Sequence, residues 1–231
     1  RLALAQNRRV AMASESDARA AILGSIRSAL RVPAERDDAA RAPEYAAIPR
    51  DYKRSGTREG EALLELFTHR LLEYDAGVER VPSGQIADAI ARLLAERGRR
   101  HIGTPGNVPR NWLPAGLPFE EAASLDALQL DKLDGVLTGC TVAIAETGSI
   151  VLQNAAAQGR RALSLVPDYH LCVVFASQVV ETVPECFTRL DATANLPTTF
   201  FSGPSATADI EMTRIKGVHG PRFLDVLLVV D

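Results

Sequence analysis

Apolar side chains recur at helical spacing in three segments of the first hundred residues. Residues 15–31 carry a weakly apolar stripe, and residues 59–74 and 83–97 carry stronger ones. Recurrence every three or four residues gathers apolar groups on one face of a helix. Residues 33–60 are instead rich in proline, glycine and charge, which is typical of an extended connection. The sequence therefore predicts three helices, with a linker between the first and the second.

Short apolar runs of strand length begin after the second predicted helix and dominate the second half of the chain. The predicted strands are residues 76–81, 100–103, 142–145, 149–152, 162–166, 171–175, 198–201 and 225–230. Several of these runs are apolar on both faces, which is typical of strands buried between helices. The pattern predicts an α/β fold over residues 59–231, preceded by an N-terminal helix and linker over residues 1–58.

Charge and cysteine content exclude several classes of protein. The chain has 231 residues with 26 Lys and Arg against 29 Asp and Glu, which gives a formal charge of −3. This balance does not provide the excess of basic residues that is typical of nucleic-acid-binding proteins. No apolar run reaches the length of about 18–20 residues that a membrane span needs. Cys140, Cys172 and Cys186 are widely spaced, so no iron–sulfur cluster is expected in this chain. Reduced thiols and an N-terminus without a secretory signal lead us to expect a cytoplasmic protein.

A carboxylate stands in the turn between two predicted strands, in the segment Ala145-Glu146-Thr147-Gly148-Ser149. In such a turn Glu146 can act as a nucleophile, as a base, or as an acceptor for a substrate hydroxyl. It can equally be a turn residue that binds nearby amides. Thr147 and Gly148 are candidate ligand-binding residues beside it.

A second candidate is the loop that follows the strand predicted at residues 198–201. It holds Ser202, Gly203, Ser205 and Thr207, before a short helix expected at residues 209–211. Small residues let backbone amides approach an anion, and amides at a helix start favour negative charge. The loop therefore predicts a pocket for phosphate or carboxylate, unless its hydroxyls merely cap its own backbone.

Two arginines and two histidines complete the set of candidates. Arg160 and Arg161 present planar guanidinium groups suited to carboxylate or phosphate. His170 and His219 are candidate proton carriers, although a lone histidine beside an apolar strand is more often structural. No G-x-S-x-G, P-loop or G-x-G-x-x-G motif is present, so hydrolase, P-loop and dinucleotide-binding interpretations lack their signatures.

Taken together and in order, these segments resemble the LUD domain, the lactate-utilisation family, in its LutC/YkgG-like branch. The resemblance covers roughly residues 60–231 and is densest after residue 134. The matching segments are 138–140, 143–152, 159–161, 165–170, 202–211 and 217–221.

This resemblance implies a NagB/RpiA/CoA-transferase-like fold, with a central, mostly parallel sheet flanked by helices. It also implies a subunit that acts with iron–sulfur partner proteins in the oxidation of L-lactate to pyruvate. Transferases of this fold place a catalytic glutamate in a Glu-x-Gly turn, which Glu146-Thr147-Gly148 resembles.

We therefore expect Glu146, the loop from Ser202 to Thr207, and Arg160 or Arg161 to line one cleft for a small anionic ligand, lactate or phosphate-like. No cofactor is assigned, and the chain is either an enzyme in its own right or a subunit of a lactate-oxidising complex. Two alternatives stay open. One is a free-standing transferase or ATP-dependent cyclo-ligase of the same fold, and the other is an anion-binding scaffold without catalysis.

Overall fold

The computed structural model describes residues 15–29, 43–208, 214–217 and 219–231. The chain divides into two compact units, residues 1–51 and residues 52–231. The first contains helix α1 (Glu15–Ala29), whose Ile22 and Ile26 are exposed. The second contains the two large sheets and every candidate site residue.

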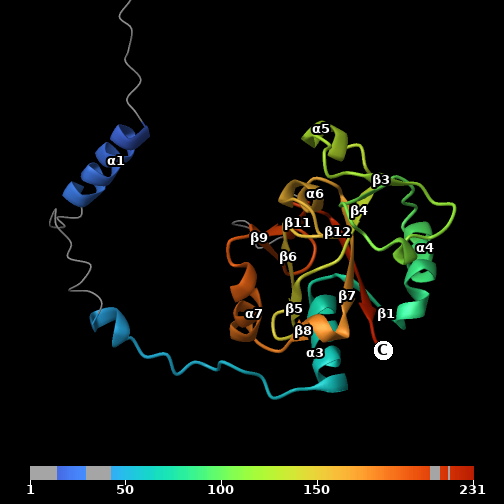
Figure 1. Ribbon diagram of the computed structural model, residues 1–231, viewed down its shortest axis with the longest axis horizontal. Coiled ribbons are helices and arrows are strands. Elements are labelled where there is room, and N and C mark those ends of the chain that lie inside the picture. The colour runs from blue at the N-terminus through green and yellow to red at the C-terminus, as the bar shows by residue number, and fades with distance from the viewer. Residues whose placement is uncertain (1–14, 30–42, 209–213, 218) are drawn as a thin grey trace, which may run out of the picture. The chain divides into compact units, whose positions relative to one another are not determined.

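A six-stranded sheet forms the centre of the second unit (Figure 1). In spatial order its strands are β1 (Gly77–Val81), β12 (Phe223–Val229), β7 (Tyr169–Phe175), β4 (Gly135–Thr138), β2 (Ile102–Thr104) and β3 (Phe119–Glu121). All neighbouring strands pair in parallel. Parallel pairing requires crossover connections, which place helices against the faces of the sheet.

Strand β7 is buried on both of its faces, because side chains alternate across a sheet. Leu171 and Val173 pack in one apolar cluster with helix α4 (Ile86–Glu96), whereas Cys172 and Val174 pack in another with helix α3 (Gly60–Glu73). Strand β12 follows the same alternation. The centre of the sheet is therefore a continuous hydrophobic layer with helices on either side.

A second, four-stranded sheet packs against the α3 side of the first. Its strands, in spatial order, are β8 (Val179–Val180), β5 (Val142–Ile144), β6 (Ser149–Gln153) and β9 (Thr198–Phe201). Strands β5 and β6 form an antiparallel hairpin, whose turn carries Glu146. Its outer face is covered by helix α7 (Val183–Leu190), through contacts of Cys186 and Leu190 with the strands. Figure 1 shows α7 outside this sheet and α4 beyond the central one.

Shorter elements connect these layers. They are η1 (Ser83–Gln85), η2 (Arg110–Trp112), α5 (Ala127–Leu130), α6 (Arg161–Leu165), η3 (Ala176–Gln178), η4 (Asp191–Thr193), β10 (Ala206–Ala208) and β11 (Arg214–Lys216). Strands β10 and β11 pair with each other in antiparallel orientation.

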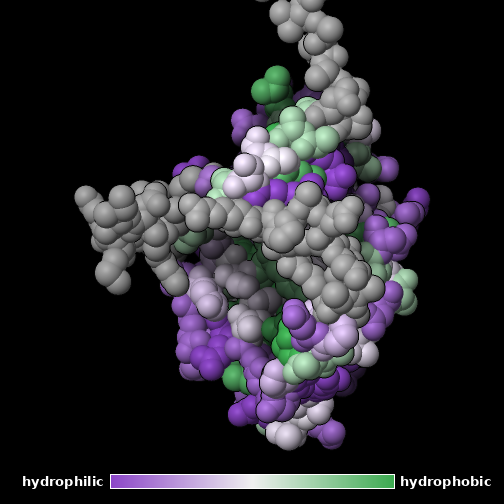
Figure 2. All heavy atoms as spheres, turned by 90° about the vertical axis from the view of Figure 1, so that its left-hand side faces the viewer, coloured by the Kyte–Doolittle hydropathy of each residue, from purple (hydrophilic) through white to green (hydrophobic). Residues whose placement is uncertain are grey.

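Hydrophilic residues cover most of the coloured surface in Figure 2, and hydrophobic residues show as smaller patches. Phe187 on α7 and Phe200 on β9 are exposed aromatic residues, with ring centroids 6.0 Å apart. Among the described residues, none of the helices combines the length and the apolar character that crossing a bilayer demands.

The predicted α/β class with a central parallel sheet is confirmed, as are the three helices predicted from spacing. The strand predicted at residues 162–166 is wrong, because this segment forms the one-turn helix α6. Gly159, at φ +71°, turns the chain before α6, and Leu163 then packs with Leu130 and Val136 beneath the sheet. Five residues are too few for apolar alternation to distinguish a strand from a helical turn.

The linker segment from Lys53 to Arg58 is fixed to the folded unit by the carboxylate of Glu181, which is 2% exposed. Glu181 Oε2 accepts the backbone N–H groups of Thr57 and Arg58 at 2.6 and 2.5 Å. Its Oε1 accepts the side chains of Lys53 and Arg58, each at 2.8 Å. The hydrogen bond from Lys53, followed by that from the Arg58 backbone, lowers the pKa of Glu181 to about 2.

Replacing Glu181 with Gln is expected to lower the free energy of unfolding by about 2 kcal/mol near pH 7, because hydrogen bonds to a charged group contribute about 1.5–3 kcal/mol. The folded pKa is depressed from an ordinary value of 4.5, so this stabilisation is present above pH 4.5 and is lost as pH falls towards 2. Urea denaturation of both proteins between pH 7 and pH 2 measures the difference. Glu59→Gln, at an exposed position, is the matched control. A difference that stays constant down to pH 2 would contradict the assignment.

Candidate functional site

Five of the residues selected from the sequence line one cavity of about 280 Å³. They are Arg161, Ser202, Gly203, Ser205 and His219. Helix α6 supplies the arginine, the segment after β9 supplies the two serines and the glycine, and the turn before β12 supplies the histidine. The cavity thus combines one cationic side chain, two hydroxyl groups and an imidazole from three separate parts of the chain.

Ser205 holds two walls of this cavity together. Its backbone N–H donates to Pro221 O at 2.8 Å, and its carbonyl accepts from Gly217 N at 2.9 Å. Its Oγ accepts from His219 N at 3.1 Å. These three bonds fix the position of the turn that carries His219 relative to the serine segment.

A row of hydroxyl groups runs from the β5–β6 turn to the cavity wall. Thr147 Oγ1 and Ser149 Oγ share a hydrogen bond of 2.7 Å, and Ser149 Oγ and Ser202 Oγ share one of 2.6 Å. Ser149 is buried, so it orients the Ser202 hydroxyl from the interior of the protein. Ser149 was visible in the sequence as part of the turn motif, but alternation alone does not tell which face of β6 meets the serine segment.

Glu146 is placed differently from its neighbour Thr147. Its carboxylate accepts from Lys53 Nζ at 2.7 Å, and Lys53 also binds Glu181. These two hydrogen bonds raise the pKa of Lys53. Glu146 is not one of the described residues that line the 280 Å³ cavity. The structure thus links the turn to the cavity through the hydrogen bonds of Thr147 and Ser149 towards Ser202, whereas Glu146 forms an ion pair with Lys53.

Gly148 and Gly203 both face helix α3. Gly148 has φ +58°, and a Cβ atom there would lie 2.8 Å from Arg70 Cβ. Gly203 has φ +87°, and a Cβ atom would overlap the side chain of Tyr74 directly after α3. The lack of a side chain at both positions therefore lets the turn and the serine segment approach α3 closely.

The two candidate histidines lie in opposite surroundings. His170 is fully buried in β7, with Nε2 2.7 Å from Thr138 Oγ1 and its ring in a T-shaped contact with the ring of Phe201. Burial lowers the pKa of His170 to about 4, so the imidazole is neutral near pH 7. Within the described part of the chain, His170 Nδ1 has no hydrogen-bond partner. His219 is exposed and borders the cavity, so it is the histidine placed to meet a ligand.

Arg160 and Thr207 complete the predicted set. Arg160 is half-buried immediately before α6, and Arg161 rather than Arg160 is among the described residues lining the cavity. The backbone of Thr207 lies in β10, whereas its side chain lies outside the described residues. The short helix expected at residues 209–211 also lies outside them.

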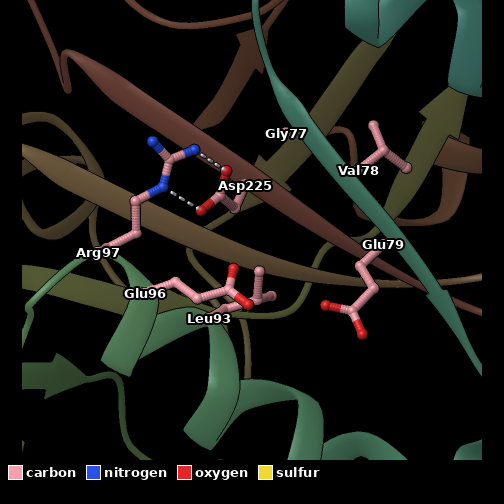
Figure 3. Close-up of a pocket in the computed structure, with 7 residues that line it drawn as sticks. All are labelled: Gly77, Val78, Glu79, Leu93, Glu96, Arg97 and Asp225. Atoms are coloured by element: carbon pink, nitrogen blue, oxygen red, sulfur yellow. Dashed lines mark hydrogen bonds and ion pairs between the residues drawn. The ribbon is translucent and has the colours of Figure 1, made fainter.

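A different cavity, of about 420 Å³, lies between β1 and α4 (Figure 3). Asp225 on β12 is buried there and accepts from Arg97 Nε at 2.9 Å, Arg97 Nη2 at 2.6 Å and Tyr169 Oη at 2.9 Å. Burial, followed by the charge of Asp225, raises the pKa of Tyr169. Arg97 and Tyr169 thus already bind the Asp225 carboxylate within the fold.

The described part of the chain offers no cluster of metal ligands. No group of three or more His, Cys, Asp or Glu side chains there is arranged to hold a metal ion. Cys140, Cys172 and Cys186 are buried and not disulfide-bonded.

Comparison with known proteins gives a consistent result. The family profile described as "LUD domain" matches residues 65–229. Lactate utilization protein C of Deinococcus radiodurans is 44% identical over 170 residues, covering 72% of this chain and 79% of that protein. The uncharacterized protein YkgG of Escherichia coli is 37% identical over 169 residues, covering 66% of this chain and 73% of that one. A crystal structure of a DUF162 family protein from Deinococcus radiodurans has a TM-score of 0.66 and 37% identity, covering 75% of this chain and all of that one.

Gly203→Ala is expected to destabilise the protein more than Gly116→Ala, by at least about 1 kcal/mol, because overpacking adds to the cost of a positive φ. The two glycines have φ angles of +87° and +84°, but only at Gly203 would the new Cβ meet other atoms within 4 Å. Urea denaturation of the two variants measures the comparison. Equal losses at the two positions would show that packing against Tyr74 is unimportant.

The imidazole of His170 is expected to stay neutral from pH 8 down to pH 5, since its folded pKa is about 4. In the unfolded chain the histidine takes up a proton near its ordinary pKa of 6.5, so its burial costs stability progressively as pH falls from 6.5 to 4. NMR titration of the ring nitrogens follows the protonation directly. A midpoint above pH 6 would be incompatible with a sealed position.

Proposed function

The chain belongs to the LUD domain family, and from that premise we propose that it serves lactate utilisation by holding a small hydroxycarboxylate, such as L-lactate, in the cavity beside Arg161. The observation that carries this proposal is the convergence of Arg161, Ser202 and Ser205 on one cavity. Relatives named lactate utilization protein C, from Deinococcus radiodurans and Halalkalibacterium halodurans, support the metabolic role.

The lining groups match the two functional groups of lactate. A guanidinium donates two parallel hydrogen bonds to a carboxylate, and serine hydroxyls can donate to its remaining lone pairs. His219, exposed at the cavity, can accept from or donate to the ligand hydroxyl. Ser149 and Thr147 hold Ser202 in place through the hydroxyl row, so the site is partly organised before a ligand binds.

Oxidation of lactate to pyruvate releases two electrons and two protons, so it needs an electron acceptor. We assign that role to iron–sulfur partner subunits, as the family resemblance implies, and we assign to this chain the binding of the acid. The free-standing transferase has less support, because Glu146 is ion-paired with Lys53 outside the cavity lining.

Arg161→Ala is expected to weaken L-lactate binding at least about tenfold, since a charge-assisted bidentate pair contributes more than the roughly 1.4 kcal/mol that a tenfold change requires. Isothermal titration calorimetry of the full chain with L-lactate measures the effect, and competition with inorganic phosphate tests whether any anion suffices. Arg110→Ala, at another exposed arginine, is the matched control. Equal lactate affinities for Arg161→Ala and the unmodified protein would overturn the proposal.

A further inference from the structure

A second cavity, of about 470 Å³, adjoins the one beside Arg161. The two share Leu165, His219 and Gly220 as a common wall. The polar part of the second lining is Asp131, Asp168 and Arg222, together with His219. It lies where the chain enters β7 and β12, because Asp168 and Arg222 directly precede these strands.

The second cavity offers hydrogen-bond acceptors as well as donors. Asp168 Oδ1 accepts from Arg222 Nε at 2.5 Å, and Arg99 Nη2 lies 3.5 Å from Oδ2. The guanidinium of Arg222 has further N–H groups beyond Nε, and a carboxylate oxygen accepts more than one bond. Asp131, just after α5, is an exposed acceptor on the same lining. A hydroxyl group both donates and accepts, so it suits this mixture better than a second anion would.

Gly217, His219 and Gly220 line the second cavity, and His219 and Gly220 also line the first. Ser205 binds Gly217 and His219 through its carbonyl and hydroxyl oxygens, as described above. A Cβ atom at Gly217 would overlap the stem of Arg222, so the glycine lets this arginine pack against the turn. The turn before β12 therefore connects the lining that holds Arg161 with the lining that holds Asp131 and Asp168.

The combined space is larger than lactate needs. Small-molecule sites span roughly 300–1,000 Å³. The cavity of about 280 Å³ falls just below this range, and the cavity of about 470 Å³ lies within it. A three-carbon acid on Arg161 would leave the second cavity unfilled, with no ligand group against Asp131 or Arg222.

We propose that the full occupant is a hydroxylated carboxylate longer than lactate, with its acid group at Arg161 and its hydroxyl groups at Asp131, Asp168 and Arg222. This inference rests on the proposed function for the acid-binding half and adds the substrate class for the other half. Lactate corresponds to the acid end of this longer ligand, which occupies the first cavity.

The test compares three carboxylates by isothermal titration calorimetry with the full chain. D-Gluconate has six carbons and five hydroxyl groups, hexanoate has the same length without hydroxyls, and L-lactate has three carbons. Gluconate is expected to bind at least about tenfold more tightly than either of the others, because its hydroxyl groups add several hydrogen bonds.

Variants assign the gain to the second cavity. Asp131→Ala is expected to reduce the ratio of gluconate to hexanoate affinity at least about fivefold, through the loss of a charged acceptor. Asp131 is exposed, so the variant is expected to fold, and circular dichroism checks this. Asp191→Ala, at an exposed aspartate on η4, is the control and is expected to leave the ratio unchanged.

The outcomes separate this inference from the proposal on which it rests. Arg161-dependent binding of lactate, with gluconate no tighter than lactate or hexanoate as tight as gluconate, overturns the longer hydroxylated ligand and leaves the anion site standing. An unchanged affinity ratio in Asp131→Ala also overturns it. If neither lactate nor gluconate binds, or if Arg161→Ala affects neither, the proposed function itself fails.

Discussion

Burial of β7 and β12 on both faces is the constraint on which the rest of the structure depends. These parallel strands are covered by α3 and the second sheet on one side and by α4 on the other, so their polar side chains take their partners from inside the protein. His170 is accordingly neutral against Thr138, and Asp225 is paired with Arg97 and Tyr169. His170 and Asp225 are therefore engaged within the interior, and the cavity beside Arg161 is lined by segments that precede or surround these two strands.

Those segments converge because of a small number of polar contacts. Ser205 joins the serine segment to the turn before β12, and Ser149 joins it to the β5–β6 turn. Glu181 anchors residues 53–58, which in turn bring Lys53 to Glu146. The lining of the cavity beside Arg161 thus depends on hydrogen bonds between loops, whereas the framework behind it depends on apolar packing.

Periodicity was sufficient to predict the α/β class and the three helices, because their apolar stripes are long. It failed at residues 162–166, where one helical turn has the same apolar alternation as a strand. Arg161, Ser202, Ser205 and His219 could be selected by residue type, and they meet at one cavity. The Lys53–Glu146 pair could not be predicted, because nothing local in the sequence reveals that a linker lysine approaches a turn 93 residues further along the chain.

The central claim is that a carboxylate binds beside Arg161, between α6 and the serine segment. A crystal structure of the protein grown with saturating L-lactate tests it most directly. We expect density for the acid with its carboxylate within hydrogen-bonding distance of the Arg161 guanidinium and the Ser205 side of the cavity. Lactate bound instead at Glu146, or in the cavity between β1 and α4, would contradict the account.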